Sequence, residues 1–318
     1  MLWLRIVVSV GLVAVLVSKR PNFDDIVPEG HHARTFAFLA LALLATLAGV
    51  VLSAWRWQRV VAAYGYEVGI GRLTLHTLVG LALNNVLPGT IGGDVIRITR
   101  LGADIDNTEV AFGSVAIERL TGFVALPLMV VIGFAIDPSL LGTGDAWLAL
   151  LIAGITLALL VSILVLAAHP KAAGRFADRT NWLRFIGAVH DGVDRLRRRP
   201  AQAAWVLVAA IAYQASVVLS IVLVATALEI HAPDAAIIAF VPAVAMVQVL
   251  PISLNGLGVR EGLLDKFLSP LGVSTGQAVA VGLCWYGLLL LVSLLGVPPF
   301  AAGRRRAPAP ATTDSVSP

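Results

Sequence analysis

The fold is decided by the stretch Leu83-Asn-Asn-Val-Leu-Pro-Gly-Thr-Ile-Gly-Gly-Asp-Val-Ile-Arg97, which interrupts an apolar chain with proline, glycine, asparagine and charge. A related stretch follows much later: Gln248-Val-Leu-Pro-Ile-Ser-Leu-Asn-Gly-Leu-Gly-Val-Arg260-Glu261. Both contain Val-Leu-Pro, with a glycine five positions and an arginine nine positions after the proline. A broken apolar segment that is repeated in two halves of a chain is typical of a transporter binding site.

The composition around these stretches is that of a membrane protein. Of 318 residues, 58% are hydrophobic and 13% charged, and the mean hydropathy is +0.88. Soluble domains carry about 25% charged residues, so we expect an integral membrane protein with several spans. The net charge of +4 comes from basic residues in connecting segments, as the positive-inside rule predicts, which argues against a nucleic-acid partner. The one cysteine, Cys284, offers neither a disulfide nor a zinc cluster, and we expect no cofactor.

Length separates the apolar segments into two kinds. Segments 73–87 and 235–250 are too short to cross a hydrocarbon core of about 30 Å as helices. Each ends at one of the Pro/Gly breaks, after which the chain returns, so we predict two re-entrant helical hairpins. The longer segments predict about six full spans, at 2–17, 35–54, 113–136, 146–168, 201–228 and 277–300. The expected fold class is an all-α polytopic membrane protein with the two hairpins in an inverted repeat.

Basic residues predict the orientation. Segment 169–200 carries eight Lys/Arg against three Asp and has apolar residues at helical spacing. It is interpreted as an amphipathic helix on the cytoplasmic surface, with a solvated basic loop as the alternative. The cluster Trp55-Arg56-Trp57-Gln58-Arg59 then marks a cytoplasmic interface, and both termini are cytoplasmic. The two hairpins enter from opposite sides. Residues 1–302 form one transmembrane domain, and 303–318 are expected to be a disordered cytoplasmic tail.

Three arginines suggest an anion site near the membrane midplane: Arg97, Arg119 and Arg260. An arginine at that depth is costly unless it is paired or serves a ligand. We expect Glu118 to pair with Arg97 or Arg260, because the adjacent Arg119 points about 100° away on a helix and is left for an anion. Helix N-termini after the glycine breaks also favour phosphate. This chemistry suits a phospholipid headgroup or a polyprenyl phosphate; the alternative is that these charges only hold the hairpins to the spans.

The candidate substrate-binding residues are the polar, charged, glycine and proline positions of the two stretches, together with the Glu-Arg pair. They are Asn84, Asn85, Pro88, Gly92, Gly93, Asp94, Arg97, Glu118, Arg119, Pro251, Asn255, Gly256, Gly258, Arg260 and Glu261. Asp94 and Glu261 are expected to be partners of the arginines or coupling carboxylates. The glycines allow close backbone approach, and the prolines break the helices.

Three motifs in order resemble a known family: Leu-Pro-Gly-x-x-Gly-Gly-Asp-x-x-Arg, Glu-Arg in the next span, and Leu-Pro-x-x-x-x-Gly-x-Gly-x-Arg-Glu. They resemble the lysylphosphatidylglycerol synthase transmembrane-region family, also called flippase-like, and the flippase half of the multiple peptide resistance factor. The resemblance runs from about residue 41 to residue 300 and departs at Asn255, where a second glycine is common. It implies a bacterial or archaeal plasma-membrane protein that moves lipid between leaflets or handles a lipid-linked substrate. The fused relatives carry an aminoacyl-transferase domain after the membrane part; this chain stops soon after Arg306, so lysyl transfer is not expected.

These observations predict a lipid flippase that is not an enzyme and that moves an anionic or aminoacylated phospholipid or a polyprenyl-phosphate-linked lipid. Two alternatives stay open. Asp24 and Asp25, in the first outer loop, suit a lipid-linked glycosyltransferase or its accessory subunit, although the sequence contains no familiar hydrolase or phosphate-loop motif. The second alternative is that the protein transports nothing and is a membrane partner of a separately encoded lipid-modifying enzyme.

Overall fold

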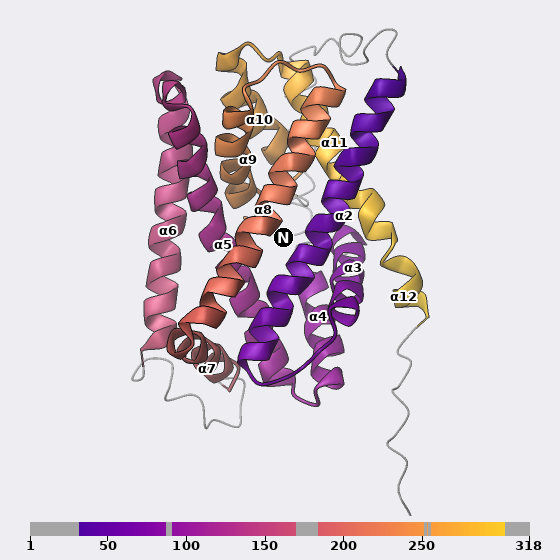
Figure 1. Ribbon diagram of the computed structural model, residues 1–318, viewed down its shortest axis with the longest axis vertical. Helices are drawn as coiled ribbons and strands as arrows, with labels where there is room; N and C mark the ends of the chain where they lie inside the picture. Colours follow the sequence, from indigo (N-terminus) through magenta and orange to yellow (C-terminus); the bar gives the residue numbers. More distant parts are fainter. Residues whose placement is uncertain (1–31, 87–90, 170–183, 251–252, 254–255, 303–318) are drawn as a thin grey trace, which may run out of the picture.

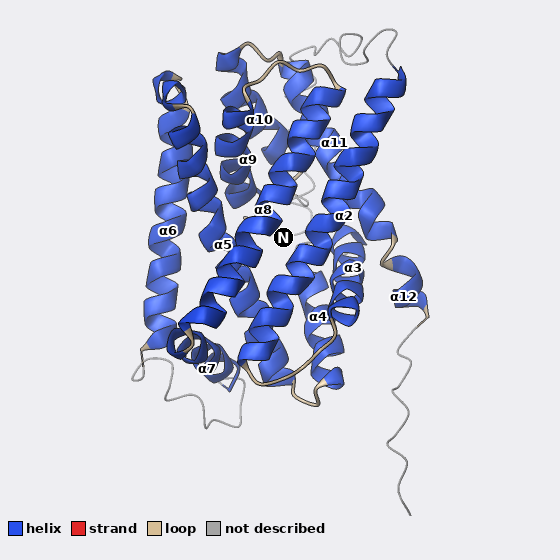
Figure 2. Cartoon of the chain, viewed as in Figure 1, coloured by secondary structure: helices blue, strands red, loops and turns tan. Residues whose placement is uncertain are grey.

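The computed structural model describes residues 32–86, 91–169, 184–250, 253 and 256–302 (Figure 1). Within these ranges the chain forms helices joined by short connections and contains no strand (Figure 2). In chain order the elements are α2 (His32–Ala63), α3 (Ile70–Val86), α4 (Ile91–Asp104), α5 (Thr108–Ile136), η2 (Pro138–Gly142), α6 (Ala146–Ala168), α7 (Arg184–Arg198), α8 (Pro200–Ala227), α9 (Asp234–Gln248), α10 (Val259–Leu268), η4 (Ser269–Leu271), α11 (Thr275–Leu294) and α12 (Val297–Ala301).

Five helical segments in the described part of the chain are long and apolar enough to cross a membrane. They are Ala33–Ala63, Thr108–Ile136, Ala146–Ala168, Pro200–Ala227 and Thr275–Ala301. Each overlaps one of the predicted spans, which makes the protein a multi-pass membrane protein. The span predicted at 2–17 lies outside the described residues, as does the tail 303–318, so the count of six stays a prediction.

The two short apolar segments form helices at opposite ends of the bundle. At about 1.5 Å per residue, α3 is about 25 Å long and α9 about 22 Å, both shorter than the hydrocarbon core. α3 packs against α4, and α9 packs against α10. Figure 1 shows the first pair in its lower half and the second pair in its upper half. The opposed arrangement matches the predicted hairpins; their re-entry into the bilayer stays a prediction.

The largest core surrounds α9, which lies against α5, α6, α8 and α10. The stacked rings of Phe240 and Phe267 join α9 to α10, with centroids 4.8 Å apart. α5 approaches α9 so closely that a Cβ at Gly133 would lie 2.5 Å from the backbone nitrogen of Ala239. Small residues let membrane helices pack this way without a hydrophobic driving force. The second short apolar helix is therefore held inside the bundle.

The predicted amphipathic segment contains one described helix, α7, at the same end as the start of α8 (Figure 1). Its apolar residues Val189, Val193 and Leu196 pack on the ends of α2 and α5, so the apolar face is turned toward the bundle. The Tyr64 hydroxyl donates a hydrogen bond of 2.7 Å to the Ala188 carbonyl oxygen, which holds α7 there. Burial raises the pKa of Tyr64 well above its usual value, so this donor keeps its proton. Residues 170–183 lie outside the described ranges.

Candidate functional site

A cavity of about 280 Å³ opens between the first hairpin and the spans α2, α5, α8 and α11. Charged and polar side chains form one part of its wall, and apolar side chains form the rest. The described residues that line it are Ser53, Arg56, Thr77, Gly80, Leu81, Asn84, Asp94, Arg97, Glu118, Arg119, Gly122, Phe123, Leu126, Tyr213, Gln214, Val217, Ala245, Gln248, Val249, Trp285 and Leu289. The cavity therefore contacts both helix pairs, because Ala245 and Gln248 lie at the end of α9 and Val249 follows directly.

Glu118 is the centre of the charged wall. It is 2% exposed, and its Oε1 accepts a hydrogen bond of 3.0 Å from Arg56 Nε and a second, shorter one from Arg56 Nη2. Its Oε2 accepts from Arg97 Nη2 at 3.2 Å, and Ser53 adds a hydroxyl donor at 3.3 Å. A buried carboxylate is tolerated when it is paired and hydrogen-bonded in this way. The predicted pair of Glu118 with Arg97 is confirmed.

Arg119 pairs with Asp94, one of the carboxylates that the sequence analysis expected to be partners of the arginines. Its Nε lies in ion-pair contact with Asp94 Oδ2, and Asp94 Oδ1 is 3.5 Å from Arg97 Nη1. The expected pairing of Asp94 with an arginine is confirmed, and the contact of Arg119 with an anion stays a prediction. Neighbouring side chains on a helix point about 100° apart. Glu118 thus faces α2 while Arg119 faces Asp94, in the first turn of α4.

The cavity keeps a net positive charge and unused donors. Among its described lining residues, three arginines stand against two carboxylates, which leaves one net positive charge. Arg56 Nη1 and Arg97 Nε are buried and have no hydrogen-bond partner among the described residues. Arg97 also lies over the ring of Trp57, with its Cζ 4.2 Å from the centroid. A stacked guanidinium with a spare N–H donor is suited to contact an anion.

Close backbone contact holds the two arms of the first hairpin together. The Gly93 amide donates a hydrogen bond of 2.8 Å to Asn84 Oδ1. A Cβ at Gly93 would lie 2.2 Å from the Gly80 carbonyl oxygen and 2.5 Å from Asn84 Oδ1. Only glycine fits here, which accounts for the glycine in the first motif. The hairpin in turn positions Asp94 and Arg97 in the cavity wall.

Gly93→Ala is expected to lower the free energy of unfolding by about 1–3 kcal/mol, the usual cost of an extra methyl in a packed core. The matched control is Gly154→Ala in α6, where an added Cβ meets nothing within 4 Å. The control is expected to leave stability unchanged or to raise it slightly, since alanine is the better helix former. Thermal unfolding in detergent compares the two; equal midpoints would show that the hairpin arms are not in tight contact.

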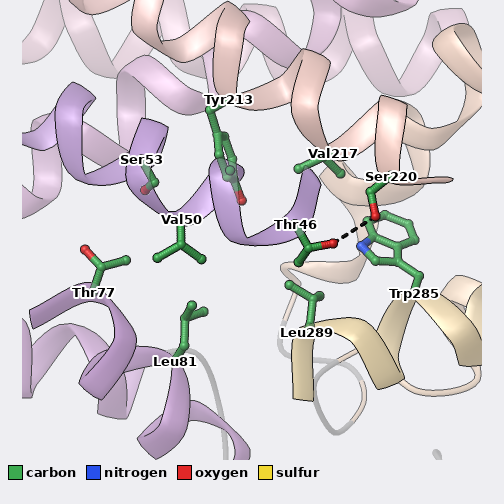
Figure 3. Close-up of a pocket in the computed structure, with 11 residues that line it drawn as sticks. Thr46, Val50, Ser53, Thr77, Leu81, Tyr213, Val217, Ser220, Trp285 and Leu289 are labelled. Atoms are coloured by element: carbon green, nitrogen blue, oxygen red, sulfur yellow. Dashed lines mark hydrogen bonds between the residues drawn. The ribbon is translucent and has the colours of Figure 1, made fainter. Parts of the chain in front are cut away.

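A smaller apolar cavity of about 60 Å³ adjoins the charged one and shares seven lining residues with it. We call it the apolar annex; it lies between α2, α3, α8 and α11 (Figure 3). Val50, Leu81, Val217 and Leu289 form much of its wall. The hydroxyl of Thr46 is bonded to Ser220 at 2.8 Å and to a backbone carbonyl, so it contributes little polarity. The two cavities together therefore have a charged part and an adjoining apolar part.

The second motif is placed differently from the first. Arg260 is 1% exposed and donates hydrogen bonds of 3.1 and 2.6 Å to Glu261 Oε1, so its partner is the next residue and not Glu118. Glu261 Oε2 also accepts from the Gly258 amide at 2.7 Å. Arg260 lies near the rings of Trp285 and Tyr286. Trp285 lines the cavity but Arg260 and Glu261 do not, so Arg97 and Arg119 share a site that Arg260 does not enter.

The other candidate residues either line the cavity, lie elsewhere in the described structure, or fall outside the described ranges. Asn84 lines the cavity, whereas Asn85 bonds Ser293 Oγ at 2.8 Å and ties α3 to α11. Gly92 and Gly256 do not line it, but a Cβ at Gly256, where φ is +81°, would lie 3.0 Å from Gln248 Cβ. Gly256 thus backs a residue of the cavity wall. Residues that lie outside the described ranges are Asp24, Asp25, Pro88, Pro251 and Asn255.

The sequence analysis missed Arg56 and the polar residues of α8. Arg56 was assigned to an aromatic and basic interface, yet it is 5% exposed and inside the bundle. The reason is that α2 continues to Ala63, two turns beyond Arg56. The apolar run Val60-Val61-Ala62-Ala63 is the signal that predicts this continuation. Tyr213 and Gln214 interrupt an apolar span in the same way as Glu118 and were available as a signal.

The comparison with protein families identifies a family that covers most of the chain. The family described as "Lysylphosphatidylglycerol synthase TM region" matches residues 2–296. This range includes both short helix pairs, every residue of the charged cavity and all of the described spans except the last five residues of the final one. A search of curated proteins finds no match. On the strength of a match over nearly the whole chain, the protein is a member of the lysylphosphatidylglycerol synthase transmembrane-region family.

Proposed function

We propose that the protein is a flippase that moves a lipid with an anionic headgroup between the leaflets of the plasma membrane, with both termini in the cytoplasm. The headgroup enters the charged cavity, and the hydrocarbon lies along the apolar annex. The two helix pairs are re-entrant hairpins that open the cavity to one leaflet and then to the other, as in transporters with inverted repeats. The protein performs no covalent chemistry on the lipid.

One observation carries this proposal: a net-positive cavity with unused guanidinium donors joins an apolar annex inside a bundle of membrane spans. A small soluble anion has no use for the annex. A purely structural ion cluster needs no excess arginine and no open volume, since buried charges are costly unless they are fully paired. An anionic lipid uses both parts of the site. The family match supports a lipid-related role.

Lipid movement in liposomes tests the proposal. Val217 lines both cavities, so Val217→Phe narrows their junction without changing any charge. We expect it to slow movement of a fluorescent anionic phospholipid by about tenfold, because an added ring in packed volume costs about 1–3 kcal/mol. The matched control is Val208→Phe on the same helix, where Val208 is 47% exposed. Dithionite bleaches labelled lipid in the outer leaflet only, so the rate at which lipid of the inner leaflet becomes accessible to dithionite measures lipid movement.

Two outcomes would contradict the proposal. If lipid moves no faster in liposomes with wild-type protein than in empty liposomes, the protein is not a flippase. Lipid binding without movement would instead favour the non-transporting partner of a separate lipid-modifying enzyme, and a pull-down from native membranes would then recover that enzyme. Equal rates of lipid movement for Val217→Phe and Val208→Phe would show that the lipid does not pass through this cavity.

A further inference from the structure

Two side-chain amides line the charged cavity without taking part in its ion pairs. Gln214, on α8, is 7% exposed, and Gln248 is the last residue of α9. Neither amide is hydrogen-bonded to another residue in the described part of the chain. An amide offers two N–H donors and an acceptor oxygen, and leaving these groups unpaired when buried is costly. They suit a ligand group that both donates and accepts hydrogen bonds, which is what a hydroxyl does.

The carboxylates of the cavity are already committed. Glu118 is shared by Arg56 and Arg97, and Asp94 is in contact with Arg97 and Arg119. No other Asp or Glu belongs to the described lining. The segments 87–90 and 251–255, whose placement is not described in full, contain no acidic residue in the sequence. An ammonium group brought into this cavity meets a net positive charge and, among the described lining residues, no carboxylate that is not already paired with an arginine.

From these two features we infer a headgroup specificity, which rests on the proposed function. The cavity selects lipids whose phosphodiester monoanion carries a polyol, and it discriminates against headgroups that carry an amine. The arginine wall contacts the phosphodiester, and the amides of Gln214 and Gln248 contact the hydroxyls. The same headgroup chemistry occurs in a glycerophospholipid with a glycerol headgroup and in a polyprenyl-phosphoryl sugar. An aminoacylated lipid is excluded, although the family name would suggest one.

A series of headgroups tests the inference by binding and by movement. Purified wild-type protein in detergent is mixed separately with phosphatidylglycerol, phosphatidylethanolamine, lysyl-phosphatidylglycerol and a polyprenyl-phosphoryl hexose. The rise in the thermal unfolding midpoint ranks their binding, since a ligand stabilises the folded state that it binds. We expect phosphatidylglycerol or the polyprenyl lipid to bind about tenfold more tightly than either amine-bearing lipid. Whichever of the two polyol lipids binds better identifies the hydrophobic anchor.

One substitution is expected to change the preference. Gln214→Glu keeps the side-chain shape and adds a carboxylate, which brings the cavity to charge balance and gives an ammonium a partner. We expect the ratio of lysyl-phosphatidylglycerol to phosphatidylglycerol binding to rise by about tenfold. The matched control is Gln202→Glu, the same change on the same helix at a position outside the cavity. The control is expected to leave the ratio unchanged.

Failure of the inference and failure of the proposed function are distinguishable. Wild-type protein that binds lysyl-phosphatidylglycerol as tightly as phosphatidylglycerol overturns the inference, as does a Gln214→Glu variant that matches Gln202→Glu. These results leave lipid movement untouched. If no lipid moves in the liposomes, the proposed flippase function is wrong. The order of binding strengths in detergent still decides whether the cavity prefers a polyol headgroup.

Discussion

Glu118→Gln is expected to lower the free energy of unfolding by about 3–5 kcal/mol, the usual cost of removing one partner from a buried ion pair. Glu118 is 2% exposed and neutralises two buried arginines, Arg56 and Arg97. Glutamine keeps the side-chain volume, so the change removes charge without opening a cavity. The cluster then holds three arginines against Asp94 alone. Titration with SDS, followed by circular dichroism, measures the loss.

A control and a compensating variant separate the buried charge from general damage. Glu67→Gln, at an exposed position between α2 and α3, makes the same chemical change and is expected to cost less than about 0.5 kcal/mol. Arg56→Met combined with Glu118→Gln removes one buried charge of each sign and is expected to be more stable than Glu118→Gln alone, since replacing a buried pair by apolar groups is often neutral. A double variant less stable than the single one would show that the two residues are not coupled through their charges.

The second large effect is expected on lipid movement. Arg119→Gln leaves Arg56 and Arg97 against Asp94 and Glu118, so the cavity becomes charge-balanced. We expect movement of an anionic lipid to slow by about 10- to 100-fold, because a hydrogen bond to a charged group contributes roughly 1.5–3 kcal/mol. Arg119 is a suitable target because its side chain is 32% exposed, so its loss costs less stability than the loss of Arg97.

Asp94→Asn provides the test of mechanism. Combined with Arg119→Gln it restores one net positive charge, and the double variant is expected to recover at least part of the lost rate. Recovery would show that the net charge of the cavity matters more than any one side chain. A double variant slower than Arg119→Gln would instead show that the contact between these two residues is itself required. Fluorescence protection in liposomes measures all three variants at one ionic strength.

The arrangement of helices follows from the sequence because apolar length and Pro/Gly breaks are local properties. The breaks at residues 88 and 251 predict two short helix pairs, and the structure contains α3–α4 and α9–α10 at opposite ends of the bundle. The pair of Glu118 with Arg97 also follows, since both are costly to bury alone. These predictions depend only on which residues can face lipid and which, being charged, must be paired inside the bundle.

The composition of the cavity is less predictable because it depends on how the helices rotate against one another. Arg56 resembles an interfacial residue until α2 is seen to continue for two more turns. Arg260 resembles Arg97 in its motif, yet Glu261 on the same turn satisfies it, so it does not turn toward the cavity. The repeat in sequence therefore predicts the two short helix pairs and overstates the likeness of their two sites.

The central claim is that the arginine-lined cavity holds the headgroup of an anionic lipid. Mass spectrometry of lipid that co-purifies with the protein in mild detergent tests it most directly. Wild-type protein is expected to retain a phosphodiester lipid well above its share of the membrane, and Arg119→Gln is expected to lose that enrichment. Retention of the same lipids by both proteins, in the proportions of the surrounding membrane, would contradict the claim.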